Sequence, residues 1–142
     1  MYSGQTLTLN MIDNDFAELN FNNLSGSVNK FDQQTLAELE TAVSMLTRGA
    51  SIKGLLVSSS KSVFVVGADI TEFSAMFAAP KEEFIAGAQH VNGLFSAIED
   101  LPYPSVAAIN GFALGGGLEV CLACDSRVMN TKSAIGLPET GL

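Results

Sequence analysis

The sequence has little positive charge and no long hydrophobic run. It contains seven Lys and Arg against fifteen Asp and Glu, a formal net charge of −8, and its basic residues are scattered singly. This distribution excludes the basic footprint that nucleic acid binding requires. No apolar run is long enough to span a membrane, and residues 1–10 lack the apolar core of a signal peptide. We therefore expect a cytoplasmic protein without a membrane span.

Cysteine and histidine are scarce as well. The two cysteines are Cys121 and Cys124, and His90, the one histidine, lies in a different predicted helix. A Cys-x-x-Cys pair is compatible with redox chemistry, but this pair falls inside an apolar helical run, which favours two buried core thiols. Zinc needs more ligands than these residues supply together, so we expect no metal site.

The remaining composition is that of a globular α/β domain. The 142 residues are 47% hydrophobic and 15% charged, enough for one domain with a sizeable core. Alternating residues predict a β-hairpin from 6–11 and 16–21, and further strands are expected at 53–58, 62–66, 105–109 and 127–130. Helices are expected after a cap at Asp32 and over 70–77, 82–99 and 118–124. This alternation predicts buried parallel strands.

The most informative segment joins strand 105–109 to three consecutive glycines. Gly115, Gly116 and Gly117 are followed by Glu119 and an apolar helical run. Backbone N–H groups at such a helix start are unshielded and favour negative charge. Donors aimed at a developing oxyanion beside a carboxylate indicate chemistry on a carbonyl compound. Taken alone, Glu119 is better explained as a first-turn carboxylate that stabilises the helix dipole.

A second turn of the same kind contains Val66, Gly67, Ala68, Asp69 and Ile70. Asp69 can cap the helix expected over 70–77, and that cap would also aim the N–H of Ala68. We expect the N–H groups of Ala68 and Gly116 to point toward one position. Without the other turn, this segment would be an ordinary strand-to-helix connection.

Four segments together resemble the crotonase (enoyl-CoA hydratase/isomerase) superfamily. They are Ser27-Val28-Asn29-Lys30, Val66-Gly67-Ala68-Asp69-Ile70, 110–119 with its three glycines, and Gly136-Leu137-Pro138-Glu139-Thr140. Their order and spacing are similar to the family over the whole chain. Residues 64–73 most resemble the branch formed by the alpha subunits of bacterial fatty-acid oxidation complexes. The resemblance implies a crotonase-like spiral of ββα turns.

The resemblance also implies roles for single residues. Glu119 and Glu139 would be the catalytic carboxylates, and the N–H groups of Ala68 and Gly116 would form the oxyanion hole. Substrate contacts are expected from Ser27, Val28, Val66, Gly67, Asp69, Ile70 and Gly115. Two alternatives stay open. One is that coenzyme A contacts, or a solvated loop, are formed by Ser25, Ser27, Asn29 and Lys30. The other is that an acyl pocket, or core packing, is formed by Phe73, Met76 and Phe77.

The function implied is enoyl-CoA hydration in fatty-acid β-oxidation. Isomerisation of the double bond on the same site is the alternative, and a non-catalytic acyl-CoA-binding or assembly fragment is another. No cofactor is expected for hydration, since coenzyme A belongs to the acyl-CoA substrate. NAD would be used only if a dehydrogenase region followed. Self-association or a thiolase-type beta subunit is the expected partner.

We interpret residues 1–142 as the N-terminal part of a hydratase domain, truncated at its C-terminal end. The loop that bears Glu139 is followed by only three residues. On this interpretation the chain alone is weakly active or inactive, and it self-associates through apolar strands that later elements would cover.

Overall fold

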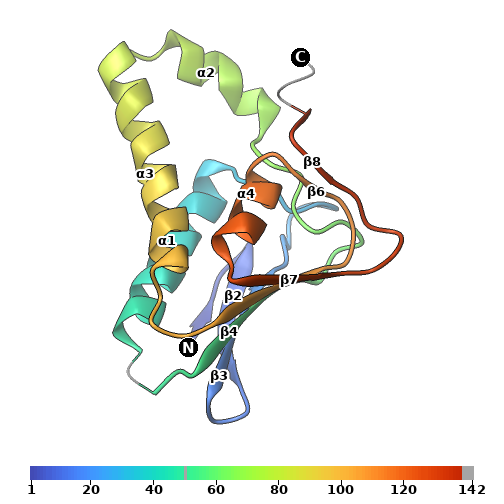
Figure 1. Ribbon diagram of the computed structural model, residues 1–142. Coiled ribbons are helices and arrows are strands. Elements are labelled where there is room, and N and C mark those ends of the chain that lie inside the picture. The colour runs from blue at the N-terminus through green and yellow to red at the C-terminus, as the bar shows by residue number, and fades with distance from the viewer. Residues whose placement is uncertain (50, 139–142) are drawn as a thin grey trace.

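The structure, a computed structural model, describes residues 1–49 and 51–138. Its main layer is a six-stranded sheet in the order β1-β2-β3-β4-β5-β7 (Figure 1). The first three strands are antiparallel, and β3, β4, β5 and β7 run parallel. The strands are β1 (Tyr2–Ser3), β2 (Leu7–Ile12), β3 (Phe16–Phe21), β4 (Gly54–Ser59), β5 (Ser105–Ile109) and β7 (Ser126–Met129).

The predicted hairpin is confirmed as β2 and β3. Leu9 pairs with Leu19, and both side chains are fully buried, because alternate residues of each strand face the core. Asp13 adopts a positive φ of 55° in the connecting turn, a conformation that Asp tolerates better than most residues. The hairpin thereby sets the alignment of β2 with β3, and the parallel strands begin with the pairing of β4 on β3.

Three helices lie together on one side of the sheet (Figure 1). They are α1 (Gln33–Arg48), α3 (Lys81–Glu99) and α4 (Gly116–Ala123). The expected cap of α1 is confirmed, since the Asp32 carboxylate accepts a hydrogen bond from the Thr35 N–H at 2.8 Å. Phe31 contacts both Phe21 and Phe95 edge to face, with ring centroids 5.7 and 5.5 Å apart. These contacts join β3, the segment before α1, and α3 in one core.

Two expected elements differ in the structure. Residues 62–66 form no strand of the main sheet; instead the Phe64 N–H donates to the Phe112 carbonyl, and the Leu114 N–H donates to that of Val65. The segment therefore pairs with the glycine-rich turn. The helix expected over 70–77 is divided into a 3₁₀ turn, η1 (Ile70–Glu72), and α2 (Phe73–Ala78).

Three strands of two residues each were not predicted, because periodicity cannot be detected over so short a span. They are β1, β6 (Ala113–Leu114) and β8 (Ile135–Gly136), and the last two form a separate parallel pair. β6 directly precedes the three glycines, and its pairing with β8 holds residues 135–136 beside them.

The helices cover only one face of the main sheet. On the other face, Ile12 and Phe16 are exposed, and Leu56 and Val106 are half-buried. No helix in the described ranges is long and apolar enough to cross a membrane.

Candidate functional site

The two glycine-containing turns lie directly against each other. Gly67 has a φ of +95°, and Gly115, which precedes α4, has a φ of +54°. An ideal Cβ placed on Gly67 would lie 2.9 Å from the Leu114 carbonyl oxygen and 3.6 Å from the Gly116 nitrogen. A side chain at this position would therefore be strained in its backbone and would press on the neighbouring turn.

The N–H groups of Ala68 and Gly116 have no hydrogen-bond acceptor among the described residues. Their neighbours, in contrast, are held: the Phe31 N–H donates to the Gly67 carbonyl at 2.7 Å, and the Gly115 N–H donates to the Gly136 carbonyl at 2.9 Å. In each turn, the residue that precedes the unpaired N–H group is thus held by a backbone hydrogen bond. Both donors are therefore free to bind water or a ligand.

Glu119 lies beside these donors in the first turn of α4. It lines the same cavity as Ala68 and Gly116, which has a volume of about 340 Å³. An ideal Cβ on Gly116 would lie 4.0 Å from the Glu119 Oε2 atom. The position satisfies both interpretations of Glu119, as a catalytic group and as a favourable charge at a helix start. Glu139, the other predicted carboxylate, lies outside the described residues.

The rest of the cavity wall comes from residues 31–36, from residues 69–76 and from α3. Of these residues, the sequence had suggested Asp69 and, as one alternative, Met76. The apolar part of the wall contains Phe31, Leu36, Met76, Ala88, Val91 and Phe95, and its polar part contains Gln33, Asp69, Glu72 and Asn92. The helical spacing of Val91 and Phe95 on α3 indicates only that both residues face inward. Such spacing cannot distinguish a packed core from the wall of a cavity.

The three residues considered for an acyl pocket have different positions. Met76 lines the cavity. Phe77 is 76% exposed and stacks on Phe84 instead, with ring centroids 6.3 Å apart. The side chain of Phe73 is outside the described part of the structure.

Asp69 forms an ion pair with Lys30, with 2.6 Å between Nζ and Oδ2. Its other oxygen accepts hydrogen bonds from the N–H and hydroxyl of Thr71, at 2.9 and 2.7 Å. The Lys30 hydrogen bond and then these Thr71 bonds lower the pKa of Asp69 to about 2. The carboxylate therefore fixes the turn that carries Ala68.

Asn29 does not belong to a solvated loop, because its side chain is buried and hydrogen-bonded within the fold. Its side-chain oxygen accepts a hydrogen bond from the Asn23 N–H, and its side-chain nitrogen donates to the carbonyl oxygens of Phe21 and Phe64. Its own carbonyl accepts from the Val66 N–H at 3.0 Å. Asn29 thus connects the 23–29 loop to the segment that leads into Gly67.

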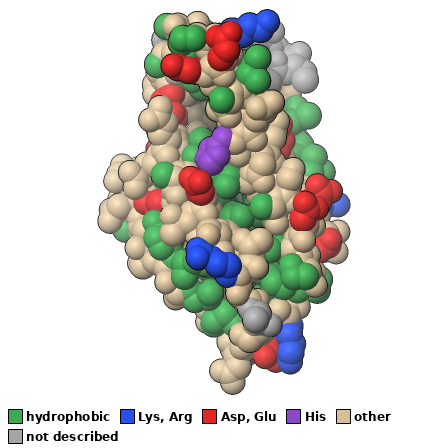
Figure 2. Space-filling view, turned by 90° about the vertical axis from the view of Figure 1, so that its left-hand side faces the viewer, with side chains coloured by type: hydrophobic (Ala, Val, Ile, Leu, Met, Phe, Trp, Pro, Cys, Tyr) green, Lys and Arg blue, Asp and Glu red, His purple; other side chains and the backbone are tan. Residues whose placement is uncertain are grey.

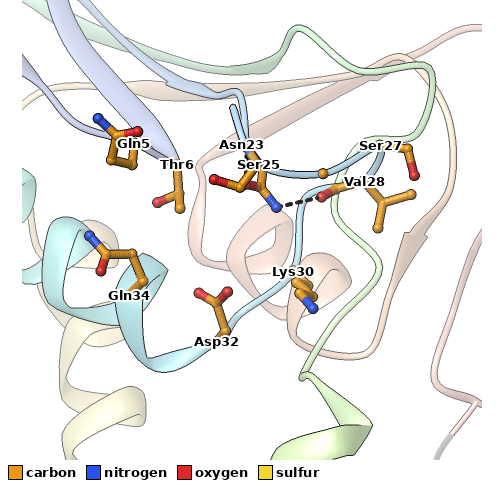
Figure 3. A pocket seen from close by; sticks show the side chains of 10 residues that line it. Gln5, Thr6, Asn23, Ser25, Ser27, Val28, Lys30, Asp32 and Gln34 are labelled. Atoms are coloured by element: carbon orange, nitrogen blue, oxygen red, sulfur yellow. Dashed lines mark hydrogen bonds between the residues drawn. The ribbon is translucent and has the colours of Figure 1, made fainter.

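Ser27 and Val28 line a second, polar cavity of about 480 Å³ (Figure 3). Lys30, Asp32 and Gln34 also line this cavity, while Phe31 and Gln33 line the one that holds Glu119. The segment 30–34 therefore separates the two cavities. Substrate contacts by Ser27 and Val28 stay a prediction, as do those expected of Val66, Gly67, Asp69, Ile70 and Gly115.

The two cysteines are buried in α4 and just after it, as expected for core thiols. Burial raises the pKa of Cys121 to about 12 and that of Cys124 to about 11. Such thiols are poor nucleophiles, which argues against redox chemistry. Within residues 1–49 and 51–138, no group of three or more His, Cys, Asp or Glu side chains is placed to hold a metal ion.

Comparison with known proteins gives consistent matches. The family described as enoyl-CoA hydratase/isomerase matches residues 12–142. The fatty acid oxidation complex subunit alpha of Pseudomonas putida is 52% identical over 142 residues, which cover all of this chain and 20% of that protein. The subunit of the same description from Pseudomonas aeruginosa is 51% identical over the same length. The chain thus spans about a fifth of these curated relatives.

Solved structures share the fold. The enoyl-CoA hydratase of Bacillus anthracis has a TM-score of 0.83 and 27% identity, covering 96% of this chain and 52% of that one. An enoyl-CoA hydratase from Shewanella pealeana has a TM-score of 0.87 and 22% identity, covering 96% and 51%. The crotonase-like fold expected from the sequence is confirmed, over about half of its usual length.

Proposed function

Because this chain belongs to the enoyl-CoA hydratase/isomerase family, we propose that it carries the hydratase site of fatty-acid β-oxidation. The reaction adds water across the 2,3 double bond of a 2-enoyl-CoA thioester. One observation carries the proposal: the unpaired N–H groups of Ala68 and Gly116 line a single cavity with the Glu119 carboxylate. The names of the curated relatives support the same assignment.

The proposed mechanism uses the two backbone donors to bind the thioester oxygen. When water attacks the β-carbon, charge moves onto this oxygen, and each donor contributes about 3–4 kcal/mol to its stabilisation, by analogy with other oxyanion holes. The turns need no reorganisation during the reaction, because Phe31 and Gly136 already hold them.

Two carboxylates divide the proton transfers in this proposal. One takes a proton from the attacking water, whose oxygen bonds to the β-carbon, and the other gives a proton to the α-carbon. Glu119 supplies one of these groups and Glu139 the other. No separate cofactor takes part, since coenzyme A is carried by the substrate, and we assign contacts with it to Ser27 and Val28 at the polar cavity.

Isomerisation of a 3-enoyl-CoA is the second candidate for this site. It moves one proton between carbons of the acyl chain and needs the same oxyanion donors with only one carboxylate. Among the described residues, Glu119 is the predicted catalytic carboxylate that lies beside the donors, and it would be sufficient for this reaction.

The setting of the site is also proposed. The curated relatives are named as subunits of a complex, which supports a multi-subunit assembly. A thiolase-type beta subunit is the proposed partner and the cytoplasm the proposed location. NAD would serve only a dehydrogenase region, separate from the site described above.

Hydration can be measured in a hybrid protein, in which this chain replaces the aligned 142 residues of the Pseudomonas putida relative. We expect the hybrid to hydrate crotonyl-CoA. Glu119→Gln and Glu139→Gln should each lower turnover by about a hundredfold or more. Thioester binding should persist, because the N–H donors are unchanged.

Glu82→Gln is the matched control, since Glu82 is an exposed carboxylate at the start of α3, outside both cavities described above. Near-native hydration by either active-site variant would remove that glutamate from the mechanism. Conversion of a 3-enoyl-CoA without hydration would favour the isomerase. Binding without any turnover in the unmodified hybrid would leave an acyl-CoA-binding function.

A further inference from the structure

A third cavity lies beside the one that contains Glu119, between α2 and α3. It has a volume of about 220 Å³ and includes Ala75, Ala79 and Phe84 in its wall. Four residues line both cavities: Gln33, Glu72, Met76 and Gly87. The two cavities are therefore adjacent and meet at this shared wall.

Gly87 lies where the cavities meet on α3. Phe84, Gly87, Ala88 and Val91 line one or both cavities, and their spacing of three and four residues places them on the same face of the helix. The wall is therefore bulky at Phe84 and Val91 and small between them. An ideal Cβ on Gly87 would meet nothing within 4 Å. Gly87 is exposed, so the space beside it is open and has room for a side chain.

Glycine weakens the interior of a helix, because it gains no packing and loses the most backbone freedom on folding. Gly87 has no tight contact that would exclude a larger residue. Its position in the wall shared by the two cavities offers a reason for glycine at this position, since a side chain there would narrow the space where the cavities meet.

We propose that Gly87 determines which acyl chain lengths the site accepts. This inference rests on the proposed function. A short 2-enoyl chain fits in the cavity with Ala68 and Glu119. A longer chain passes Gly87 and enters the cavity between α2 and α3. The apolar part of this wall, from Ala75 to Phe84, suits an apolar chain, and the polar Gln33, Glu72 and Glu83 also line the cavity. A side chain at residue 87 would block the way from the first cavity to the one between α2 and α3, and it would leave the reacting carbons undisturbed.

The hybrid protein tests this with crotonyl-CoA and 2-decenoyl-CoA. Gly87→Leu should lower kcat/KM for 2-decenoyl-CoA by about tenfold more than it lowers kcat/KM for crotonyl-CoA. Gly93→Leu is the matched control, because Gly93 is in the same helix, also has nothing within 4 Å of an ideal Cβ, and lines neither cavity. It gains the same helix propensity and should leave both substrates unaffected.

The possible outcomes separate the two proposals. An equal change for both chain lengths, or the same selectivity change in Gly93→Leu, would overturn the role of Gly87. An unmodified hybrid that hydrates neither thioester would instead contradict the proposed function. If Gly87→Leu does not fold, Gly87→Ala takes its place with a smaller loss for 2-decenoyl-CoA alone, and no loss there overturns the inference.

Discussion

The body of the molecule and its helical arm are packed very differently. The body is the six-stranded sheet with α1, in which Leu7, Leu9 and Leu39 are fully buried. The arm is α2 with the first half of α3, residues 73–90, and none of its described side chains is buried. Figure 2 views the molecule from the side of α3, with its histidine on the surface. The arm extends beyond the sheet in Figure 1.

In the proposed function, this contrast separates the reacting groups from the part of the wall assigned to the acyl chain. The turn at Ala68 is bonded to Phe31 next to α1, and Glu119 lies on the short helix α4, which is largely buried. The arm contributes Met76 and Gly87 to the far part of the cavity. The proposed chemistry therefore lies in the tightly packed region, and the proposed selection of chain length lies in the lightly packed one. Substitutions in the two regions should have different consequences.

The largest effect is expected from Glu38, a buried carboxylate of the body. It accepts hydrogen bonds from the N–H groups of Gln5 and Thr6 at 2.9 Å, and one from the Gln34 side chain at 2.8 Å. Glu38→Ala leaves these donors without their acceptor and should lower the free energy of unfolding by about 3 kcal/mol. Urea denaturation of the variant and the wild type measures this difference in the free energy of unfolding. Glu82→Ala in the arm should change little, and equal effects of the two variants would contradict the contrast.

Gly67→Ala should damage activity more than stability. The positive φ and the Leu114 carbonyl at 2.9 Å from a Cβ force the turn to move, and with it the Ala68 N–H. A displacement of about 1 Å lowers turnover by about a hundredfold. The hydration rate of the hybrid measures this loss, with Gly93→Ala in α3 as the control. Unchanged hydration would show that the Ala68 turn does not set the rate.

A smaller effect is expected from pH, again through Glu38. Burial alone would raise the pKa of Glu38, but hydrogen bonds from Gln34, Thr6 and Gln5 outweigh it and lower the pKa below its ordinary value. The stabilisation by the ionised form is therefore present above the unfolded-state pKa and is lost as the pH falls through the folded-state pKa. Glu38→Gln should lie below the wild type in stability at neutral pH and approach it in acid. A constant difference at all pH values would exclude this linkage.

The smallest effect concerns association of the 142-residue chain. β7 is an edge strand of the main sheet, and its Val128 and Met129 side chains are 64% and 47% exposed. Exposed apolar edge strands promote pairing between molecules. Sedimentation should show self-association that Val128→Lys reduces. A monomeric wild-type chain at all concentrations would contradict this expectation.

The sequence was informative where one face of an element is buried. Alternation identified β2 and β3, and Asp32 was correctly identified as the cap of α1. The glycine turns were identified because Gly67 and Gly115 need backbone conformations that other residues avoid. These are local signals, and each can be detected within a few residues.

Features that depend on distant segments were not predicted. Residues 62–66 have the composition of a strand, but they pair with the turn at 112–114, nearly fifty residues away in sequence. Glu38 and Asn29 resemble surface residues until their partners in β2 and at Phe64 are known. The cavity wall on α3 has the same periodicity as a helix that packs in a core. Only the folded structure distinguishes the two.

The central claim is that Ala68 and Gly116 polarise the thioester carbonyl. Infrared difference spectroscopy of a 2-enoyl-CoA bound to the Glu119→Gln hybrid measures this directly, because slow turnover preserves the substrate. The account predicts a carbonyl stretch at lower frequency than for the thioester in water, and a return toward that value when Gly67→Ala is added. A bound thioester whose carbonyl frequency equals that in water would contradict it.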